Sequence, residues 1–306
     1  MGQRPQVQAP DDGRPQAATN PGNTGQMLIL GAAVLWGTSG TAQALGPDAA
    51  APVLIAIVRV GLGGIALLAA AALRGNLGGV PRYLRPVLAL AGLAQAVFNA
   101  SYFTALSMTG VAVGTMISVG SVPIFSGALG VLANREPADL RWYGATGMAV
   151  VGVVLLSGGA GTTIVDPFGV FFALVAGFSY SLFIFLSGRL VRTLPPDALI
   201  GTAFMVATVI LLPFAAALPV AWAVTPQGAG LVFYMGLVSS GFAYMLYGRG
   251  LRTVLISRVG TLTLAEPLTG SMLGIFLLGE GLTVRSAIGM VLVFVAQVLI
   301  VARRSR

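Results

Sequence analysis

The chain has 306 residues, of which 56% are hydrophobic and only 8% are charged, and its formal net charge is +8. Soluble globular proteins carry about 25% charged residues, so this deficit excludes a water-soluble enzyme, a nucleic-acid-binding protein and a disordered chain as leading interpretations. The composition predicts an integral membrane protein with several crossings, and these are helical if the apolar runs are long enough to span a bilayer.

The side chains that the sequence lacks limit its chemistry. It contains no Cys and no His, and all 17 basic residues are Arg. Without Cys and His there is no disulfide, no thiol nucleophile and none of the commonest metal ligands. Without Lys there is neither Schiff-base chemistry nor the phosphate-binding loop of ATP-hydrolysing proteins. We therefore expect no catalytic residues, no metal, no cofactor and no nucleic-acid partner.

The predicted elements begin after a polar segment. Residues 1–26 are rich in Pro, Gln and Gly, and we expect them to form a disordered cytoplasmic tail rather than a signal peptide. From Met27 onward, apolar runs of about the length that crosses a bilayer as a helix are separated by short polar or Gly/Pro joints. These runs predict ten transmembrane helices, with nine or eleven as alternatives. They are 27–45, 52–73, 86–107, 110–132, 142–158, 167–188, 198–219, 229–249, 255–278 and 284–302.

Arginines are distributed unequally between the joints. If the N-terminus is cytoplasmic, the joints after runs two, four, six and eight and the two tails hold 14 of the 17 arginines, whereas the opposite side holds only Arg285. Basic residues concentrate in cytoplasmic loops. The pattern therefore predicts a multi-pass protein of a bacterial-type inner membrane with both termini in the cytoplasm.

Two halves of the sequence are related. Pro123 and Pro267 are separated by the same 144 residues as Glu136 and Glu280. The halves, 27–158 and 167–302, contain five predicted helices each, so the second half enters the membrane from the opposite side. Inverted repeats are typical of transporters, in which similar halves exchange conformations. The alternative is an old duplication that is kept only for packing.

A motif in each half carries a family resemblance. Tyr-x-x-Ala-Leu at 102–106 corresponds to Tyr-x-x-Gly-Leu at 247–251, and each is followed by the mid-helix Pro and a Glu 13 residues later. Together with Trp36-Gly37 and Arg59, this order resembles the EamA-type transporters of the drug/metabolite transporter superfamily over residues 27–302. The resemblance implies two inverted five-helix repeats around a central substrate cavity, and export or exchange of small metabolites, including amino acids.

Polar side chains inside the predicted helices indicate where that cavity lies. The third and eighth helices carry polar residues at the spacing i, i+4, i+7, which places them on one helix face, and the two stripes are equivalent under the repeat. We predict that such residues bind substrate; the alternative is hydrogen bonding between helices. The predicted substrate-binding residues are Trp36, Gln95, Asn99, Tyr102, Tyr180, Ser240, Tyr244, Tyr247 and Glu266.

Charged side chains also occur inside predicted spans: Glu266, Arg59 and Arg258. Glu266 is near the middle of its run, where an ionised carboxyl costs a few kcal/mol on insertion scales. It binds a cationic substrate group, carries a coupling proton, or is structural. For Arg59 we favour a structural pairing with Glu266 over contact with a substrate carboxylate or extension to the surface. Arg258 lies only three residues inside its run, so we expect its side chain to extend to the cytoplasmic surface.

The repeated Pro and Glu residues receive structural interpretations. Pro123 and Pro267 remove backbone hydrogen bonds, and they act either as hinges or as fixed bends. Glu136 and Glu280 follow helix C-termini, where a negative charge is unfavourable. We therefore expect each to have a partner, such as Arg141 or Arg285.

These observations predict a secondary transporter. It exports or exchanges small amphipathic metabolites, with amino acids favoured, across the inner membrane by alternating access. The resemblance disfavours phosphorylated substrates, because carriers of such substrates in the superfamily generally place Lys and Arg in the cavity and this chain has no Lys. The alternatives are export of other drugs or metabolites of the same superfamily, or a membrane scaffold or sensor without flux. An intramembrane enzyme is disfavoured because the spans contain one acidic residue, too few for a metal site.

Overall fold

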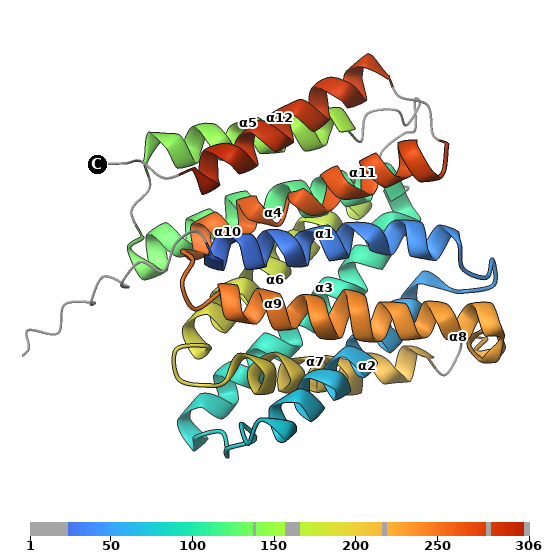
Figure 1. Ribbon diagram of the computed structural model, residues 1–306, viewed down its shortest axis with the longest axis vertical. Helices are drawn as coiled ribbons and strands as arrows, with labels where there is room; N and C mark the ends of the chain where they lie inside the picture. The colour runs from blue at the N-terminus through green and yellow to red at the C-terminus, as the bar shows by residue number, and fades with distance from the viewer. Residues whose placement is uncertain are drawn as a thin grey trace, which may run out of the picture.

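A computed structural model describes residues 24–109, 111–136, 139–156, 166–215, 219–279 and 283–302, and every regular element in these ranges is helical (Figure 1). The α-helices of the first half are α1 (Thr24–Ala44), α2 (Pro52–Leu73), α3 (Arg85–Thr109), α4 (Val111–Asn134) and α5 (Leu140–Leu156). Those of the second half are α6 (Pro167–Leu190), α7 (Pro196–Ala215), α8 (Pro226–Phe233), α9 (Ala243–Gly250), α10 (Ile256–Leu262), α11 (Ala265–Leu277) and α12 (Val284–Val301). Three further segments are the 3-10 turns η1 (Arg82–Leu84) and η2 (Ala221–Val224) and the π-helix η3 (Tyr234–Phe242).

The helical class that the sequence predicts is confirmed for these residues. Among the described residues, seven helices are long and apolar enough to cross a membrane. They are 53–73, 82–109, 117–134, 167–190, 196–215, 226–250 and 284–301. Of the ten apolar runs predicted from the sequence, the eighth (229–249) forms one rod from α8, η3 and α9. The ninth (255–278) is divided into α10 and α11. The count of ten crossings therefore stays a prediction.

The N-terminal boundary differs from the expected one. Helix α1 begins at Thr24, so residues 24–26, which the sequence analysis assigns to the tail, belong to the first helix. Residues 1–23 lie outside the described residues. Glu280, which the sequence analysis pairs with Glu136, lies outside them as well.

The division between α10 and α11 has a local cause at Pro267. A proline lacks the backbone N–H and its ring clashes with the carbonyl four residues earlier, which here belongs to Thr263. The Thr263 hydroxyl donates to the Gly260 carbonyl (2.8 Å), and the chain turns at Leu264 before α11 starts. Pro123 has no such effect, because α4 continues through it. The two prolines are equivalent in sequence but not in structure.

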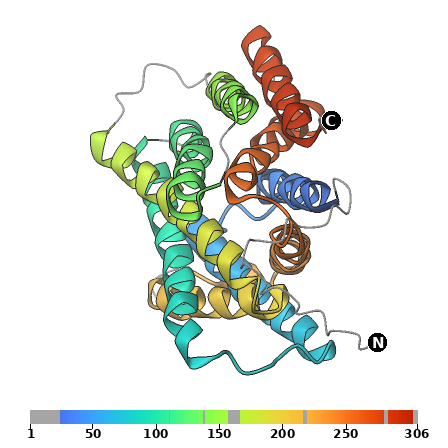
Figure 2. The same cartoon turned by 90° about the vertical axis from the view of Figure 1, so that its left-hand side faces the viewer.

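The two halves are packed into each other rather than side by side. Helix α3 packs against α6, α2 against α7, and α5 against α12, while α1 contacts both α9 and α11. Figures 1 and 2 show α5 and α12 together at one edge of the bundle, far from α2 and α7 at the opposite edge. Large apolar side chains such as Phe171, Phe214 and Phe294 are exposed on the outside. Such a surface suits contact with lipid.

Candidate functional site: a cavity between the two halves

A cavity of about 470 Å³ lies inside the bundle. Side chains from α1, α2, α3, α4, α6, η3, α9 and α11 line it, so both halves contribute to its wall. Its volume is in the range of about 300–1,000 Å³ that is usual for small-molecule sites.

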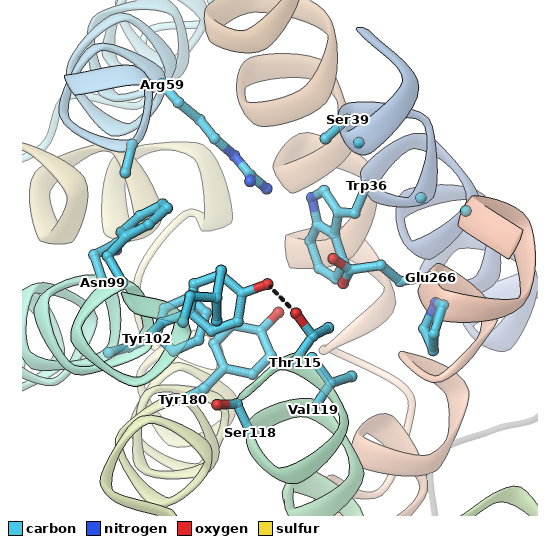
Figure 3. Close-up of a pocket in the computed structure, with 18 of the residues that line it drawn as sticks. Trp36, Ser39, Arg59, Asn99, Tyr102, Thr115, Ser118, Val119, Tyr180 and Glu266 are labelled. Atoms are coloured by element: carbon cyan, nitrogen blue, oxygen red, sulfur yellow. Dashed lines mark hydrogen bonds between the residues drawn. The ribbon is translucent and has the colours of Figure 1, made fainter. Parts of the chain in front are cut away.

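Most of the residues that the sequence singles out meet at this cavity. The lining includes Trp36, Asn99, Tyr102, Tyr180, Tyr244 and Glu266, together with Arg59 and Pro267. Figure 3 shows the labelled side chains entering from different helices. Residues that are more than 200 positions apart in the sequence, such as Trp36 and Glu266, therefore face one space.

Four predicted residues lie outside the wall. Tyr247 is fully buried behind it, with its ring centroid 5.4 Å from that of Trp36. Gln95 is buried one turn before Asn99, whose side-chain amide donates to the Gln95 carbonyl oxygen (2.8 Å). Ser240 contacts Arg59 (3.1 Å between Oγ and Nε), and Pro123 is buried within α4.

One end of the cavity is closed by aromatic rings. The ring of Trp36 lies 4.7 Å from Tyr244 and 6.5 Å from Tyr180 between centroids, and Tyr244 lies 4.6 Å from Phe204. Phe183 and Phe204 are fully buried beneath them. This cluster is the barrier between the cavity and the end of the bundle at which α1 begins.

At the other end, the cavity extends toward the C-terminus of α1 and the N-terminus of α2. Gly40 and Gln43 late in α1, Ile55 early in α2, and Leu106 late in α3 all line it. A close approach of α11 shapes the same wall. A Cβ at Gly37 would lie 2.6 Å from the backbone oxygen of Glu266, so this contact between α1 and α11 requires glycine.

Two opposite charges face the cavity from different helices. The Nε of Arg59, on α2, donates to the Ser240 hydroxyl, and Glu266 is in the first turn of α11. In Figure 3 their side chains enter from opposite sides. The sequence favours a structural pairing of Arg59 with Glu266. In the described part of the chain no ion pair joins these two side chains.

Sequence reasoning missed one wall of the cavity. Thr115, Ser118, Val119 and Val122 on α4 line it, and the hydroxyls of Thr115 and Tyr102 share a hydrogen bond (2.9 Å, Figure 3). Their spacing of i, i+3, i+4, i+7 is the signal of one helix face. It resembles ordinary helix packing because two of the four side chains are apolar.

Glu136 has a different partner from the expected Arg141. Its Oε1 accepts a hydrogen bond from the N–H of Ile256 (3.0 Å), and its Oε2 accepts one from the N–H of Ser257 (2.9 Å). The indole N–H of Trp142 donates to the Ser257 carbonyl oxygen (3.0 Å). The first turn of α10 is therefore tied to both α4 and α5, at the end of the bundle away from the cavity opening.

A second, smaller cavity adjoins the first. It has a volume of about 260 Å³ and lies between α2, α3 and α7. Ala56, Asn99 and Phe103 line both spaces. No group of three or more acidic side chains that could hold a metal ion occurs among the residues that the structure describes.

Comparisons with known proteins agree with this arrangement. The EamA-like transporter family matches the chain twice, over residues 23–158 and 167–302. The chain is 37% identical over 281 residues to the uncharacterized transporter YwfM of Bacillus subtilis, covering 92% of this chain and 95% of that one. It is 28% identical to the uncharacterized inner membrane transporter YedA of Escherichia coli, covering 82% and 81%. A solved crystal structure that is 19% identical shares the fold, with a TM-score of 0.78 over 91% of this chain and 96% of that one.

Proposed function

This chain belongs to the EamA-like transporter family, and we propose that it is a secondary transporter that exports or exchanges small amphipathic metabolites, with amino acids favoured. The observation that carries the proposal is the cavity between the halves, where an arginine and a glutamate enter from opposite sides above a floor of aromatic rings. A free amino acid presents the matching carboxylate, ammonium group and apolar side chain.

The proposed architecture is two inverted repeats of five transmembrane helices, over 27–158 and 167–302. In support, each of the ten predicted apolar runs overlaps a helix or two or more consecutive helical segments in the described part of the chain. An odd number of crossings in each half inverts the second half relative to the first. Inverted halves allow a cavity at their interface to face either side of the membrane in turn.

We place both termini in the cytoplasm of a cell with an inner membrane. The arginine distribution supports this orientation. The cavity then opens toward the outer side, because it extends to the C-terminus of α1, and the aromatic cluster closes the cytoplasmic side. Under this proposal, the arrangement is an outward-facing state of an alternating-access cycle.

The charges favour an amino acid over an anionic phosphorylated metabolite. In the described lining Arg59 is the single basic residue and Glu266 the single acidic one. A phosphate group carries about two negative charges and is usually held by several basic groups. One Arg balanced by one Glu suits a ligand with one charge of each sign.

The test is exchange of labelled amino acids by the purified protein in proteoliposomes, with and without a pH gradient. We expect saturable exchange of a subset, reduced at least ten-fold in Tyr102→Ala and in Glu266→Gln. Val291→Ala is the matched control, because Val291 is 60% exposed on the outer face of α12. We expect Val291→Ala to leave the rate of amino-acid exchange unchanged.

The outcomes separate the alternatives. If Glu266→Gln exchanges amino acids with an unchanged dependence on the pH gradient, Glu266 does not carry a coupling proton. If no amino acid exchanges, the substrate is another metabolite, and a panel of amphipathic amines and acids is tested next. Absence of flux for every solute supports a scaffold or sensor.

A further inference from the structure

One nitrogen of the Arg59 guanidinium, Nε, is hydrogen-bonded, and the other two have no hydrogen-bond partner among the described residues. Its Nε donates to the Ser240 hydroxyl at 3.1 Å, and this is its one hydrogen bond to the described residues. A guanidinium has five N–H donors, so four have no partner among the described residues, at a side chain that lines the cavity. Glu266 faces the same cavity but forms no ion pair with Arg59 among the described residues. A guanidinium inside a membrane protein without a directly bonded acceptor is expensive, which indicates that an acceptor belongs there.

The position of Ser240 depends on a close helix contact. A Cβ at Gly63 on α2 would lie 2.6 Å from the Cβ of Ser240, so only glycine lets α2 and η3 approach this closely. Ser239, the preceding residue, donates or accepts a hydrogen bond with Ser39 of α1 (2.7 Å). The π-helix η3 is thereby attached to both α1 and α2, and Ser240 is fixed relative to Arg59.

A second donor at the same cavity also lacks an acceptor. The side chain of Trp36 is 2% exposed, and its Nε1 has no hydrogen-bond partner among the residues described. Contacts with the rings of Tyr244 and Tyr247, at 4.7 and 5.4 Å, hold the indole in place. Figure 3 shows the indole nitrogen and the Arg59 guanidinium facing the same space.

We propose that Arg59 and the Trp36 N–H form a subsite for a carboxylate of the transported ligand, and that Ser240 is a positioning residue for Arg59. This inference rests on the proposed function and assigns one end of the ligand within it. Two parallel N–H groups of a guanidinium match the two oxygens of a carboxylate. The indole N–H donates to one of the same oxygens, and Glu266 on the opposite side receives the cationic end.

The experiment measures ligand-induced thermal stabilisation of the purified full-length protein. The probes are leucine, phenylalanine and threonine, each titrated beside its amide, which keeps the ammonium group but removes the negative charge. We expect at least one amino acid to bind at least ten-fold more tightly than its amide. This preference is the readout, because a variant that only weakens the fold does not change it.

Three variants test the named groups. Arg59→Gln abolishes the preference for the acid over the amide, since the charge is lost. Trp36→Phe keeps an aromatic ring and removes the N–H, and it reduces binding of the acid about ten-fold or more without weakening binding of the amide equally. Ser240→Ala retains the charge and reduces the preference by a smaller factor, because Arg59 is no longer fixed.

Each result has a defined meaning. The subsite is overturned if amino acids and their amides bind equally, or if Trp36→Phe and Ser240→Ala leave the preference unchanged. Binding of the amides without the acids also overturns it, but leaves a transporter of amines intact. If neither class binds and neither exchanges in proteoliposomes, the proposed amino-acid function is overturned together with the subsite. Trp36→Phe and Ser240→Ala keep the test decisive if Arg59→Gln does not fold.

Discussion

Glu136, two residues after the end of α4 in the first half, accepts hydrogen bonds from Ile256 and Ser257 at the start of α10 in the second half. The geometry depends on Arg135, whose φ of 53° turns the chain back so that the Glu136 N–H reaches the Gly130 carbonyl (3.1 Å). The charge that is unfavourable at the end of its own helix is thus placed at the N-terminus of another, where it is favourable.

The first prediction follows from this contact. In Glu136→Gln one accepting oxygen is replaced by an NH₂ group that cannot accept from the backbone N–H. We expect a loss of about 1 kcal/mol in unfolding free energy, as for other helix N-cap substitutions. Thermal unfolding in detergent measures this loss. The control is Asp139→Asn, because the Asp139 carboxylate accepts from the backbone N–H of Trp142 and so caps a helix within the first half without joining the two halves.

The same variant tests whether this contact belongs to one conformational state. The chain contains no Cys, so a single Cys at Thr263, in the cavity lining, reports access without background. We expect a cytoplasmic thiol reagent to label Thr263→Cys faster when Glu136 is also changed to Gln. Equal rates contradict the idea that the contact favours the state described here.

The break at Pro267 leads to a second prediction. Pro267→Ala supplies the missing N–H and relieves the clash with Thr263, so α10 and α11 become one continuous helix and Glu266 moves relative to the cavity. We expect a transport rate reduced about ten-fold with unchanged or increased thermal stability. Pro123→Ala is the matched control, because α4 is already continuous there. An equal effect of the two substitutions contradicts this reasoning.

An ion pair between α2 and α7 gives a third prediction. Arg74 pairs with Asp197, and their side chains are 41% and 7% exposed. Because the Arg74 side chain is partly exposed to solvent, we expect Asp197→Asn to cost about 1 kcal/mol rather than the larger loss of a fully buried pair. A double-mutant cycle with Arg74→Gln measures the coupling. A coupling energy of zero shows that the pair contributes nothing to stability.

The hydroxyl pair in the cavity wall gives a fourth prediction. Tyr102→Phe and Thr115→Val each remove one partner of the hydrogen bond between α3 and α4. We expect each to lower the unfolding free energy by about 1 kcal/mol, and the double variant to lower it by less than the sum. Thermal unfolding of the four proteins measures this. Additive losses show that the two hydroxyls act independently.

Two of the predicted residues that line the cavity lie on one face of α3. Asn99 and Tyr102 lie at i and i+3 on α3, which continues unbroken past the cavity. Gln95 is on the same face one turn earlier, but the aromatic cluster closes the cavity before that depth. Periodicity identifies a face, but it does not show how far a cavity extends along it.

Tyr247 lies behind the cavity wall although its equivalent in the repeat, Tyr102, lines the cavity. The repeat equates the two residues on the assumption of 3.6 residues per turn in both halves. The segment Tyr234–Phe242 is a π-helix, in which hydrogen bonds span one more residue, and the register after it is shifted. Nothing in the residue types of this segment distinguishes it from an α-helix, so only the structure shows that Ser240 faces Arg59.

The interlocked packing of the two halves has a consequence for biosynthesis. Arg59 is translated 181 residues before its hydrogen-bond partner Ser240. At 5–20 residues per second, this interval lasts on the order of ten to forty seconds. During that time the nascent first half holds an arginine among lipids or insertion machinery without its final hydrogen bond. Truncation after the first half therefore leaves a fragment whose polar faces have no lasting partner, and we expect the cell to degrade it unless the second half is co-expressed.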